Sequence, residues 1–213
     1  RTPTGNKDEP ALADVVEDFE LTERSGRKVT NKEVLGRPWA VCFVFTNCAG
    51  PCPLVTGKMK LLQDRFAGTP LRLVTITVDP KRDTPQRLTQ YAEAFGADEE
   101  QWLFLTGEQN EIYHLIGHSF GLTVREEIGK SRKKGWEITH STRVVHVDAA
   151  GHIQGKYDAK DDVEMAALAR ALEKELRELP INSGEESQPV DAPVPPLRDQ
   201  AVATPPASNA KGR

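Results

Sequence analysis

A buried strand that runs straight into a helix constrains the fold of this chain more than any other sequence feature. Residues 41–46 are an uninterrupted apolar, β-rich run bounded by Pro38 and Asn47, which is typical of a parallel strand covered on both faces. Apolar residues then recur every three or four positions from Cys52 to Phe66, so a helix follows almost immediately. The pattern predicts a strand and a helix at the centre of an α/β domain.

Strand and helix patterns alternate through the rest of the region. Asp18 to Leu21 and Lys28 to Thr30 predict a β-hairpin that turns at Ser25–Gly26. The other expected elements are, in order, a strand at 71–78, a helix that begins at Thr84–Pro85, a strand at 102–105, a helix at 109–120, a hairpin of 143–147 with 153–157, and an amphipathic helix at 161–179. This order predicts a thioredoxin-like α/β fold with three layers, an N-terminal β-hairpin and a C-terminal ββα unit.

Polar segments rich in proline flank the predicted domain. Residues 180–213 hold seven of the 15 prolines and show no hydrophobic periodicity, so we expect a disordered tail. Residues 1–14 are polar and broken by proline and glycine, which predicts a flexible tether. The predicted organisation is therefore a tether, one domain at 15–179, and a tail.

Charge and hydropathy limit the partners of the chain. A formal net charge of -4 gives no general attraction to nucleic acid, so we expect no nucleic-acid partner. No apolar run approaches the ~18–20 residues of a membrane span. The chain begins at Arg1 without a signal sequence, and we expect any membrane attachment to come through an anchor that this sequence does not include.

Two of the three cysteines stand where the buried strand meets the helix. Cys48 and Cys52 are separated by Ala49–Gly50–Pro51, an i,i+4 relation that brings both sulfurs to one side of a helical turn. A helix N-terminus stabilises thiolate over thiol, which makes such cysteines nucleophilic or metal-binding. The pair alone is compatible with Cu(I), with Zn²⁺ if more ligands arrive, or with thiol–disulfide exchange.

Four sequence blocks occur in order across roughly residues 15–175. They are Phe45–Pro53 (F-T-N-C-A-G-P-C-P), Thr77–Pro85 (T-V-D-P-K-R-D-T-P), Leu105–Gly107 (L-T-G), and His140–Thr142 (H-S-T) followed by Val147–Asp148. Each resembles a block of the SCO/SenC copper-chaperone family, whose patterns include F-T-x-C-x-x-x-C-P and D-P-x-R-D-T-P. Several blocks in order are much harder to obtain by chance than one short motif, so the chain is identified as a member of that family.

The resemblance implies a thioredoxin-like domain, held at a membrane and facing the periplasm or the intermembrane space, that binds one copper ion as Cu(I) or Cu(II). The implied ligands are Cys48, Cys52 and His140. Two thiolates and a neutral imidazole give Cu(I) a soft trigonal site. The chain departs from the family at Asn47, where histidine is common, and at Thr139, where aspartate is common. Loss of a carboxylate beside His140 is expected to weaken or retune the site.

Two functions compete for the cysteine pair. The resemblance implies a copper-delivery protein that loads the copper A site of cytochrome c oxidase subunit II, or another copper protein, after an upstream donor has supplied the ion. The alternative is a thiol:disulfide oxidoreductase without a physiological metal, in which Cys48 attacks and Cys52 resolves. His140 favours the chaperone, because a dithiol exchanger has no need for a distal imidazole. A thiol peroxidase is set aside because Thr46 stands two, not three, positions before Cys48.

The remaining cysteine and histidines have simpler explanations. Cys42 lies inside the apolar run and is expected to be a buried core thiol. His146 is interpreted as a packed strand residue and His152 as an exposed turn residue. His114 and His118 have the i,i+4 spacing of a metal-binding helix, but we expect no carboxylate or cysteine to adjoin them, so surface positions are favoured over a second metal site.

Two charged segments complete the set of candidates. Asp79–Asp83 resembles a cluster of catalytic carboxylates, but helix capping by Asp83 and Thr84 and neutralisation by Arg82 favour a structural loop over a contact with a partner. Residues 130–136 place four cations and Trp136 just before the histidine block. A solvated loop is the default interpretation, and the sharper hypothesis is a docking patch for an acidic donor or acceptor domain.

We predict that residues 180–213 contribute nothing to stability, because a proline-rich segment without an amphipathic face does not pack on a core. A chain truncated after residue 179 should unfold at the same temperature as the full chain in a thermal melt. A drop of several degrees would contradict this prediction and show that the tail packs on the domain.

Overall fold

The secondary structure follows the alternation seen in the sequence. The computed structural model describes residues 15–129 and 133–179. Its helices are α1 (Cys52–Arg65), α2 (Pro85–Ala94), α3 (Gln109–His118), α4 (Asp162–Glu178) and the short 3₁₀ helix η1 (Asn31–Glu33). Its strands are β1 (Glu20–Glu23), β2 (Lys28–Thr30), β3 (Trp39–Val44), β4 (Arg72–Thr77), β5 (Trp102–Thr106), β6 (Val124–Glu126), β7 (Ile138–His140), β8 (Arg143–Val147) and β9 (Ile153–Asp158).

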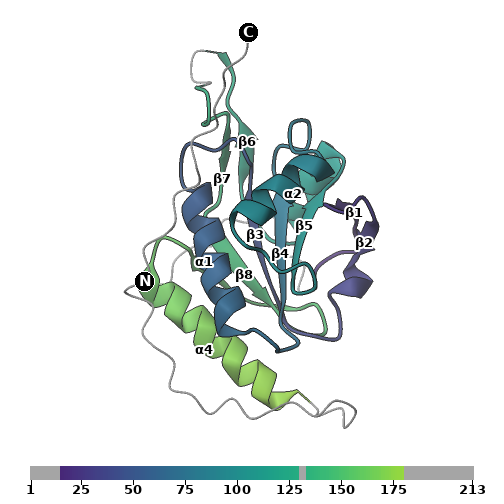
Figure 1. The fold of residues 1–213 in the computed structure, drawn as a ribbon, viewed down its shortest axis with the longest axis vertical. Coiled ribbons are helices and arrows are strands. Elements are labelled where there is room, and N and C mark those ends of the chain that lie inside the picture. The colour runs from purple at the N-terminus through teal and green to yellow at the C-terminus, as the bar shows by residue number, and fades with distance from the viewer. Residues whose placement is uncertain (1–14, 130–132, 180–213) are drawn as a thin grey trace, which may run out of the picture.

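Seven of these strands form one sheet in the order β2-β1-β5-β4-β3-β8-β9 (Figure 1). Strands β3, β4 and β5 are parallel, whereas β1, β2, β8 and β9 join them by antiparallel pairings. Every residue of β3 is buried, as the apolar run predicted. The predicted thioredoxin-like fold, with its N-terminal β-hairpin and its C-terminal ββα unit, is confirmed.

Helices cover both faces of the sheet and so make three layers. Helices α1, α2 and α4 lie on one face, in front of the sheet in Figure 1. Arg65 of α1 donates a hydrogen bond to Glu173 of α4 at 3.2 Å. The Tyr91 ring of α2 packs edge-on against the Phe104 ring of β5. On the other face Phe120, just after α3, packs edge-on against Phe43 of β3 with ring centroids 5.2 Å apart. The central strands are therefore shielded from water on both sides.

Two features are not predicted by the sequence patterns, namely the short 3₁₀ helix η1 and the two-stranded antiparallel ribbon of β6 and β7. Val124 pairs with His140, and Glu126 pairs with Ile138. Each strand has three residues, and the connection is far longer than that of a tight hairpin, so no hairpin signal exists. The other predicted elements agree with the structure to within about two residues at their ends, which is the usual spread of such boundaries.

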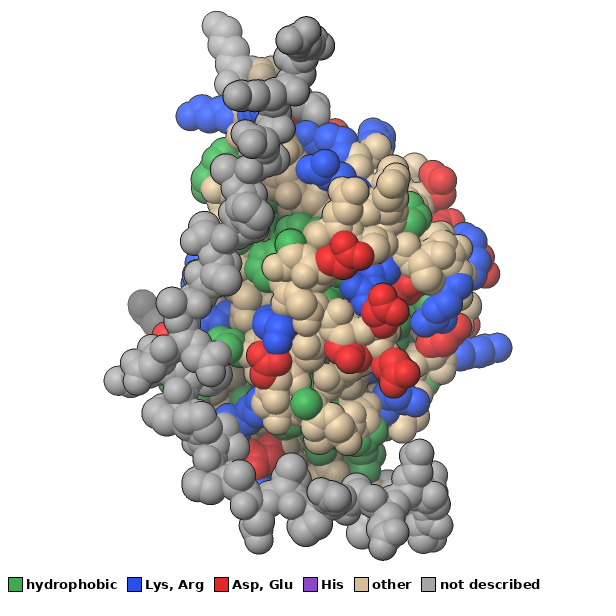
Figure 2. Space-filling view, viewed as in Figure 1, with side chains coloured by type: hydrophobic (Ala, Val, Ile, Leu, Met, Phe, Trp, Pro, Cys, Tyr) green, Lys and Arg blue, Asp and Glu red, His purple; other side chains and the backbone are tan. Residues whose placement is uncertain are grey.

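Some predicted features lie outside the described residues. These are the tether at 1–14, the tail at 180–213 and residues 130–132 of the basic segment. Among the helices that the structure does describe, none is both long enough and apolar enough to cross a membrane. On the face shown in Figure 2, basic and acidic side chains are interspersed.

Cys42 gives a direct test of how β3 is packed. Its thiol is fully buried, burial raises its pKa to about 12, and its sulfur lies 3.4 Å from the Thr75 hydroxyl oxygen. We predict that peptide mapping of the oxidised protein finds one disulfide, Cys48–Cys52, and that Cys42 is alkylated only after unfolding. A disulfide between Cys42 and either of the other cysteines would contradict the buried position.

Candidate metal centre

The loop after β3 places both cysteines at the start of α1. The Cys48 N–H donates to the Phe45 carbonyl at 3.2 Å, which closes a turn directly after the strand. Pro51 occupies the cap position, and Cys52 is the first residue of the helix. Cys52 is fully buried and Cys48 is partly exposed. One sulfur therefore faces the core, and the other is accessible from solvent.

His140 reaches the cysteines from the end of β7. Its Nε2 lies 3.2 Å from Cys52 Sγ, although the two residues are 88 positions apart in the sequence. The ring packs edge-on against Phe45, with centroids 5.7 Å apart and planes 79° apart. The three residues that the family resemblance implies as ligands lie together, since one ligand atom from each of Cys48, Cys52 and His140 lies within 4.8 Å of the others.

A backbone carbonyl sets the tautomer of His140. Its Nδ1 lies 2.9 Å from the Ser141 carbonyl oxygen, which only accepts hydrogen bonds, so Nδ1 carries the proton and the neutral ring presents the Nε2 lone pair to the sulfurs. Thr139, where the family commonly has aspartate, instead donates its hydroxyl to Glu127 at 2.7 Å. The Ser141 carbonyl therefore orients the His140 ring, as an aspartate carboxylate would otherwise do.

The two sulfurs differ in acidity. The pKa of Cys48 is lowered to about 5, chiefly because the Cys52 thiol donates to its sulfur, with a further hydrogen bond from the Gly50 N–H. The pKa of Cys52 is raised, first by burial and then by the neighbouring Cys48 thiolate. Near neutral pH the metal-free pair therefore holds one proton, on Cys52, and one negative charge, on Cys48.

The residues between the cysteines must be small because the segment 135–136 packs directly against Ala49 and Gly50. The Ala49 N–H donates to the Gly135 carbonyl at 2.8 Å. A Cβ on Gly50 would lie 2.8 Å from the Trp136 ring, and a Cβ on Gly135, where φ is +80°, would lie 2.5 Å from the Ala49 Cβ. The segment that leads into β7 is therefore packed directly on residues 45–51, the connection from β3 to α1 that is called the cysteine loop below.

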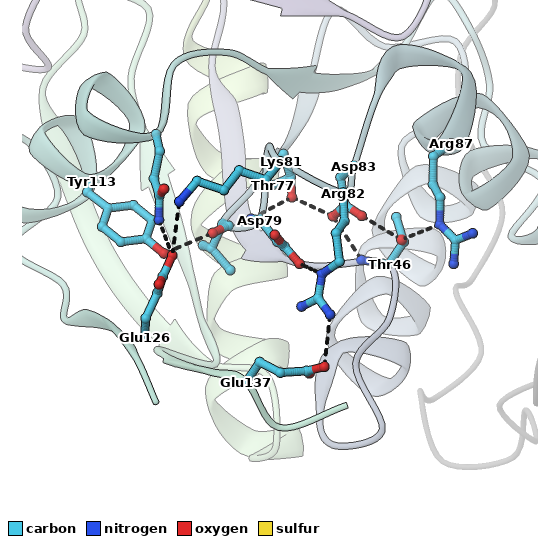
Figure 3. Close-up of polar contacts among 12 residues, drawn as sticks. Thr46, Thr77, Asp79, Lys81, Arg82, Asp83, Arg87, Tyr113, Glu126 and Glu137 are labelled. Atoms are coloured by element: carbon cyan, nitrogen blue, oxygen red, sulfur yellow. Dashed lines mark hydrogen bonds and ion pairs between the residues drawn. The ribbon is translucent and has the colours of Figure 1, made fainter. Parts of the chain in front are cut away.

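A buried carboxylate fixes the start of the cysteine loop (Figure 3). Asp83 accepts hydrogen bonds from the Thr46 N–H at 3.0 Å, the Thr46 hydroxyl at 2.6 Å and the Thr77 hydroxyl at 2.5 Å. Burial raises the pKa of Asp83, and these three bonds oppose that rise. Arg87 also donates to the Thr46 hydroxyl oxygen at 2.9 Å. The Asp79–Asp83 segment is thus a structural loop, as predicted, although Thr84 alone caps α2.

The same loop holds the strand that carries His140. The Arg82 guanidinium bonds Asp79 and also Glu137 at 2.8 Å, and Glu137 directly precedes β7 (Figure 3). The Arg82 hydrogen bond lowers the pKa of Glu137. These residues flank a polar cleft of about 190 Å³ that Lys81, Glu126 and Ile138 also line. Sequence reasoning paired Arg82 with a neighbouring aspartate but missed Glu137, because nothing in the local pattern marks a partner 55 positions away.

The donor set decides which ions the centre fits. Two sulfurs and one imidazole nitrogen are soft ligands that suit Cu(I), with Zn²⁺ next if a fourth ligand is supplied. Hard ions such as Mg²⁺ and Ca²⁺ require oxygen ligands, which none of these three residues offers. The residues present therefore fit a copper ion.

The simpler explanations for three other candidates are confirmed. Cys42 is a core thiol, as described above. His146 is buried on β8 with its Nε2 2.6 Å from Glu175 of α4. His152 is about half exposed and lies 3.4 Å from Asp148.

The expectation that no carboxylate adjoins His114 and His118 is wrong. Both histidines are exposed on α3, but Glu17 Oε2 lies 3.2 Å from His114 Nε2. The glutamate comes from the segment before β1, so sequence spacing within the helix gives no sign of it.

Comparison with known proteins assigns the family. The family model described as SCO1/SenC matches residues 7–177. The chain belongs to the SCO1/SenC family. Among curated relatives, this SCO1/SenC protein is 28% identical to the SCO1 protein homolog of Bacillus subtilis over 150 residues, which are 69% of this chain and 75% of the relative. It is 27% identical to a putative copper-binding protein of Stutzerimonas stutzeri over 158 residues, 72% of this chain and 73% of the relative.

Solved structures of the family share the fold. The structure that identified a disulfide switch in BsSco, a member of the Sco family of cytochrome c oxidase assembly proteins, is 25% identical with a TM-score of 0.65 and covers 80% of this SCO1/SenC chain and 96% of its own. Bradyrhizobium japonicum ScoI with copper bound is 22% identical with a TM-score of 0.64, covering 76% and 99% of the two chains. A SCO1/SenC family lipoprotein from Bacillus anthracis is 24% identical with a TM-score of 0.68, covering 78% and 98%.

We predict that Cys48 of the metal-free protein is alkylated by iodoacetamide with a pH midpoint near its pKa of about 5. Because the thiolate is the nucleophile, a lowered pKa shifts the pH–rate profile below the ordinary cysteine value of ~8.5. Cys52, whose pKa is raised, should remain unmodified in the same samples at neutral pH. A Cys48 midpoint at the ordinary value would contradict the proposed hydrogen bonding.

Proposed function

We propose that this SCO1/SenC protein carries one copper ion as Cu(I) and delivers it to the copper A site of cytochrome c oxidase subunit II or to another copper protein. The observation that carries the proposal is the convergence of Cys48, Cys52 and His140, whose donor atoms lie within 4.8 Å of one another. Relatives support copper as the cargo, since one is described as copper-binding and another was solved with copper bound. The description of BsSco as a member of a family of oxidase assembly proteins supports the proposed target.

Each ligand has its own part in loading the ion. The partly exposed Cys48 thiolate is the first donor that an incoming Cu(I) meets. The ion then displaces the proton of Cys52, because a thiol must ionise to become a strong metal ligand. His140 supplies the Nε2 lone pair that its Nδ1–H···O bond to Ser141 keeps available. One Cu⁺ enters as one H⁺ leaves, so the charge of the site does not change.

Release of the ion requires the reverse exchange with an acceptor. We propose that acceptor thiolates approach on the side of Cys48, because Cys52 is fully buried behind it. Trp136 covers Gly50 between the cysteines and keeps 53% of its own surface exposed, so it borders this approach. Lys133 and Lys134 precede it and suit an acidic donor or acceptor domain.

A second candidate function, thiol:disulfide exchange, is favoured by the lowered pKa of Cys48. The Cys48 thiolate would attack a disulfide of the target, one target sulfur would leave as thiolate, and Cys52 would lose its proton and close a Cys48–Cys52 disulfide. The target disulfide is then reduced by two electrons to a dithiol, and the pair is oxidised by two. Reduction of the copper-ligand cysteines of the same acceptor would make the two functions successive steps.

We further propose that the protein works outside the cytoplasm, in the periplasm or an equivalent compartment, held there by a membrane anchor. The support for this proposal is the family resemblance alone. Fractionation of cells that produce the natural protein, followed by detection in the membrane and soluble fractions, tests the location.

We predict that a serine at either site cysteine abolishes stoichiometric Cu(I) binding, because no other soft donor among the described residues adjoins the site. His140→Ala should weaken Cu(I) binding by about tenfold or more yet leave it measurable, since two thiolates still form a linear site. Competition with a chromophoric Cu(I) chelator under anaerobic conditions measures all three variants.

The control for these variants is His152→Ala, which removes an exposed histidine beside Asp148 and should leave Cu(I) affinity unchanged. Dithiol activity should show a different pattern, lost with either cysteine and insensitive to His140. Full Cu(I) affinity in His140→Ala, together with robust dithiol activity, would contradict the chaperone and support the oxidoreductase.

A further inference from the structure

A second group of metal-ligating side chains gathers on the surface at α3. His114 and His118 lie one turn apart, and their rings stack with centroids 4.1 Å apart and planes 22° apart. Glu17 brings its Oε2 to 3.2 Å from His114 Nε2. One ligand atom from each of these three residues lies within 4.8 Å of the others. Two ligands at ~2.1 Å from one tetrahedral ion are roughly 3.4 Å apart, so small side-chain rotations bring all three donors onto one ion.

The backbone holds Glu17 in place beside the helix. Its N–H donates to the Ser119 hydroxyl oxygen at 3.1 Å, and Ser119 is a fully buried residue directly after α3. The preceding Val16 N–H donates to the Gly151 carbonyl at 2.9 Å, and Val15 forms a β-bridge with His152. Contacts with segments far away in the sequence therefore place the Glu17 carboxylate beside the two histidines; the Ser119 bond alone spans 102 positions.

We propose that Glu17, His114 and His118 form a second metal site that binds a divalent transition-metal ion such as Zn²⁺. Two imidazoles and one carboxylate are the donor set of open three-ligand zinc sites, with water in the fourth position. The set contains no sulfur, so it discriminates against Cu(I), the ion that the cysteine site prefers. The last turn of α3, which includes His118, also places partial negative charge near the ion.

An ordinary surface ion pair does not explain all three residues. A pair of exposed charges accounts for Glu17 and His114, whose side chains are 42% and 57% exposed, and contributes little to stability. The ion pair does not involve His118, whose ring nitrogen also lies within 4.8 Å of the other two donor atoms. A shared ion involves all three residues and links the segment before β1 to the end of α3. None of the three residues belongs to the copper centre, so the two groups share no ligand.

Zinc titration of the full chain tests the proposal once the thiol site is removed. The background variant is Cys48→Ser with Cys52→Ser, followed by isothermal titration with Zn²⁺ as the probe. We expect one Zn²⁺ ion per chain. Addition of His118→Ala or Glu17→Gln should reduce the affinity at least about tenfold, because even residues that only support a metal ligand cost about 10–100-fold when lost.

The matched control is His152→Ala in the same background, since His152 is another exposed histidine beside a carboxylate and its bridge to Val15 is made by the backbone, which the substitution keeps. It should leave the zinc affinity unchanged. Zinc should also shift the ring resonances of His114 and His118 in NMR spectra more than those of His152. Absence of saturable zinc binding would overturn the proposal. Equal zinc affinity in the His118→Ala variant and in its background would overturn it as well, because the ion would then bind only scattered surface histidines.

Discussion

The contact between Cys52 Sγ and His140 Nε2 depends on an imidazole that comes from outside the central sheet. β7 has three residues and pairs only with β6, so its own hydrogen bonds are too few to hold the ring in place. The position of His140 is instead set by contacts with the cysteine loop and its neighbours. These are the Arg82 bridge to Glu137, the Ala49 bond to Gly135, and the packing of Phe45 on the ring.

Because the same loops hold the cysteines and the histidine, the site is organised before any ion arrives. Asp83 bonds Thr46 two residues before Cys48, and Arg82, its neighbour, holds Glu137 three residues before His140. The cysteine loop and the segment that leads to His140 are therefore both attached to the loop between β4 and α2. A preorganised set of ligands lowers the entropic cost of binding the ion. Because both segments are attached to the same loop, displacement of the cysteine loop also displaces the segment that carries His140.

The charge of the metal-free pair also suits a monovalent ion. Cys48 is the thiolate and Cys52 the thiol, so replacement of one proton by Cu⁺ leaves the net charge of a largely buried site unchanged. A divalent ion would add one positive charge to the same low-dielectric environment, which is costly without a further anionic ligand. The surface group of Glu17, His114 and His118 is exposed and offers a carboxylate in place of sulfur, so the two sites favour different ions.

The sequence predicts those parts of the structure that depend on local pattern. The apolar run of β3, the proline-started helices and the cysteine spacing each carry their own signal, and the fold follows from their order. The proposed histidine ligand was identified through the family resemblance, since no local signal links His140 to residues 88 positions earlier. The β6–β7 ribbon, Glu137 and Glu17 were missed because each depends on a contact between distant segments, and their own short stretches carry no periodicity.

X-ray absorption spectroscopy of the protein loaded with one equivalent of Cu(I) tests whether Cys48, Cys52 and His140 bind the ion together, because it reports the ligand atoms around the ion. We expect a three-coordinate Cu(I) with two sulfur ligands and one imidazole nitrogen, and the loss of the imidazole signal in His140→Ala. A spectrum with sulfur ligands only, identical in the native chain and in His140→Ala, would contradict it.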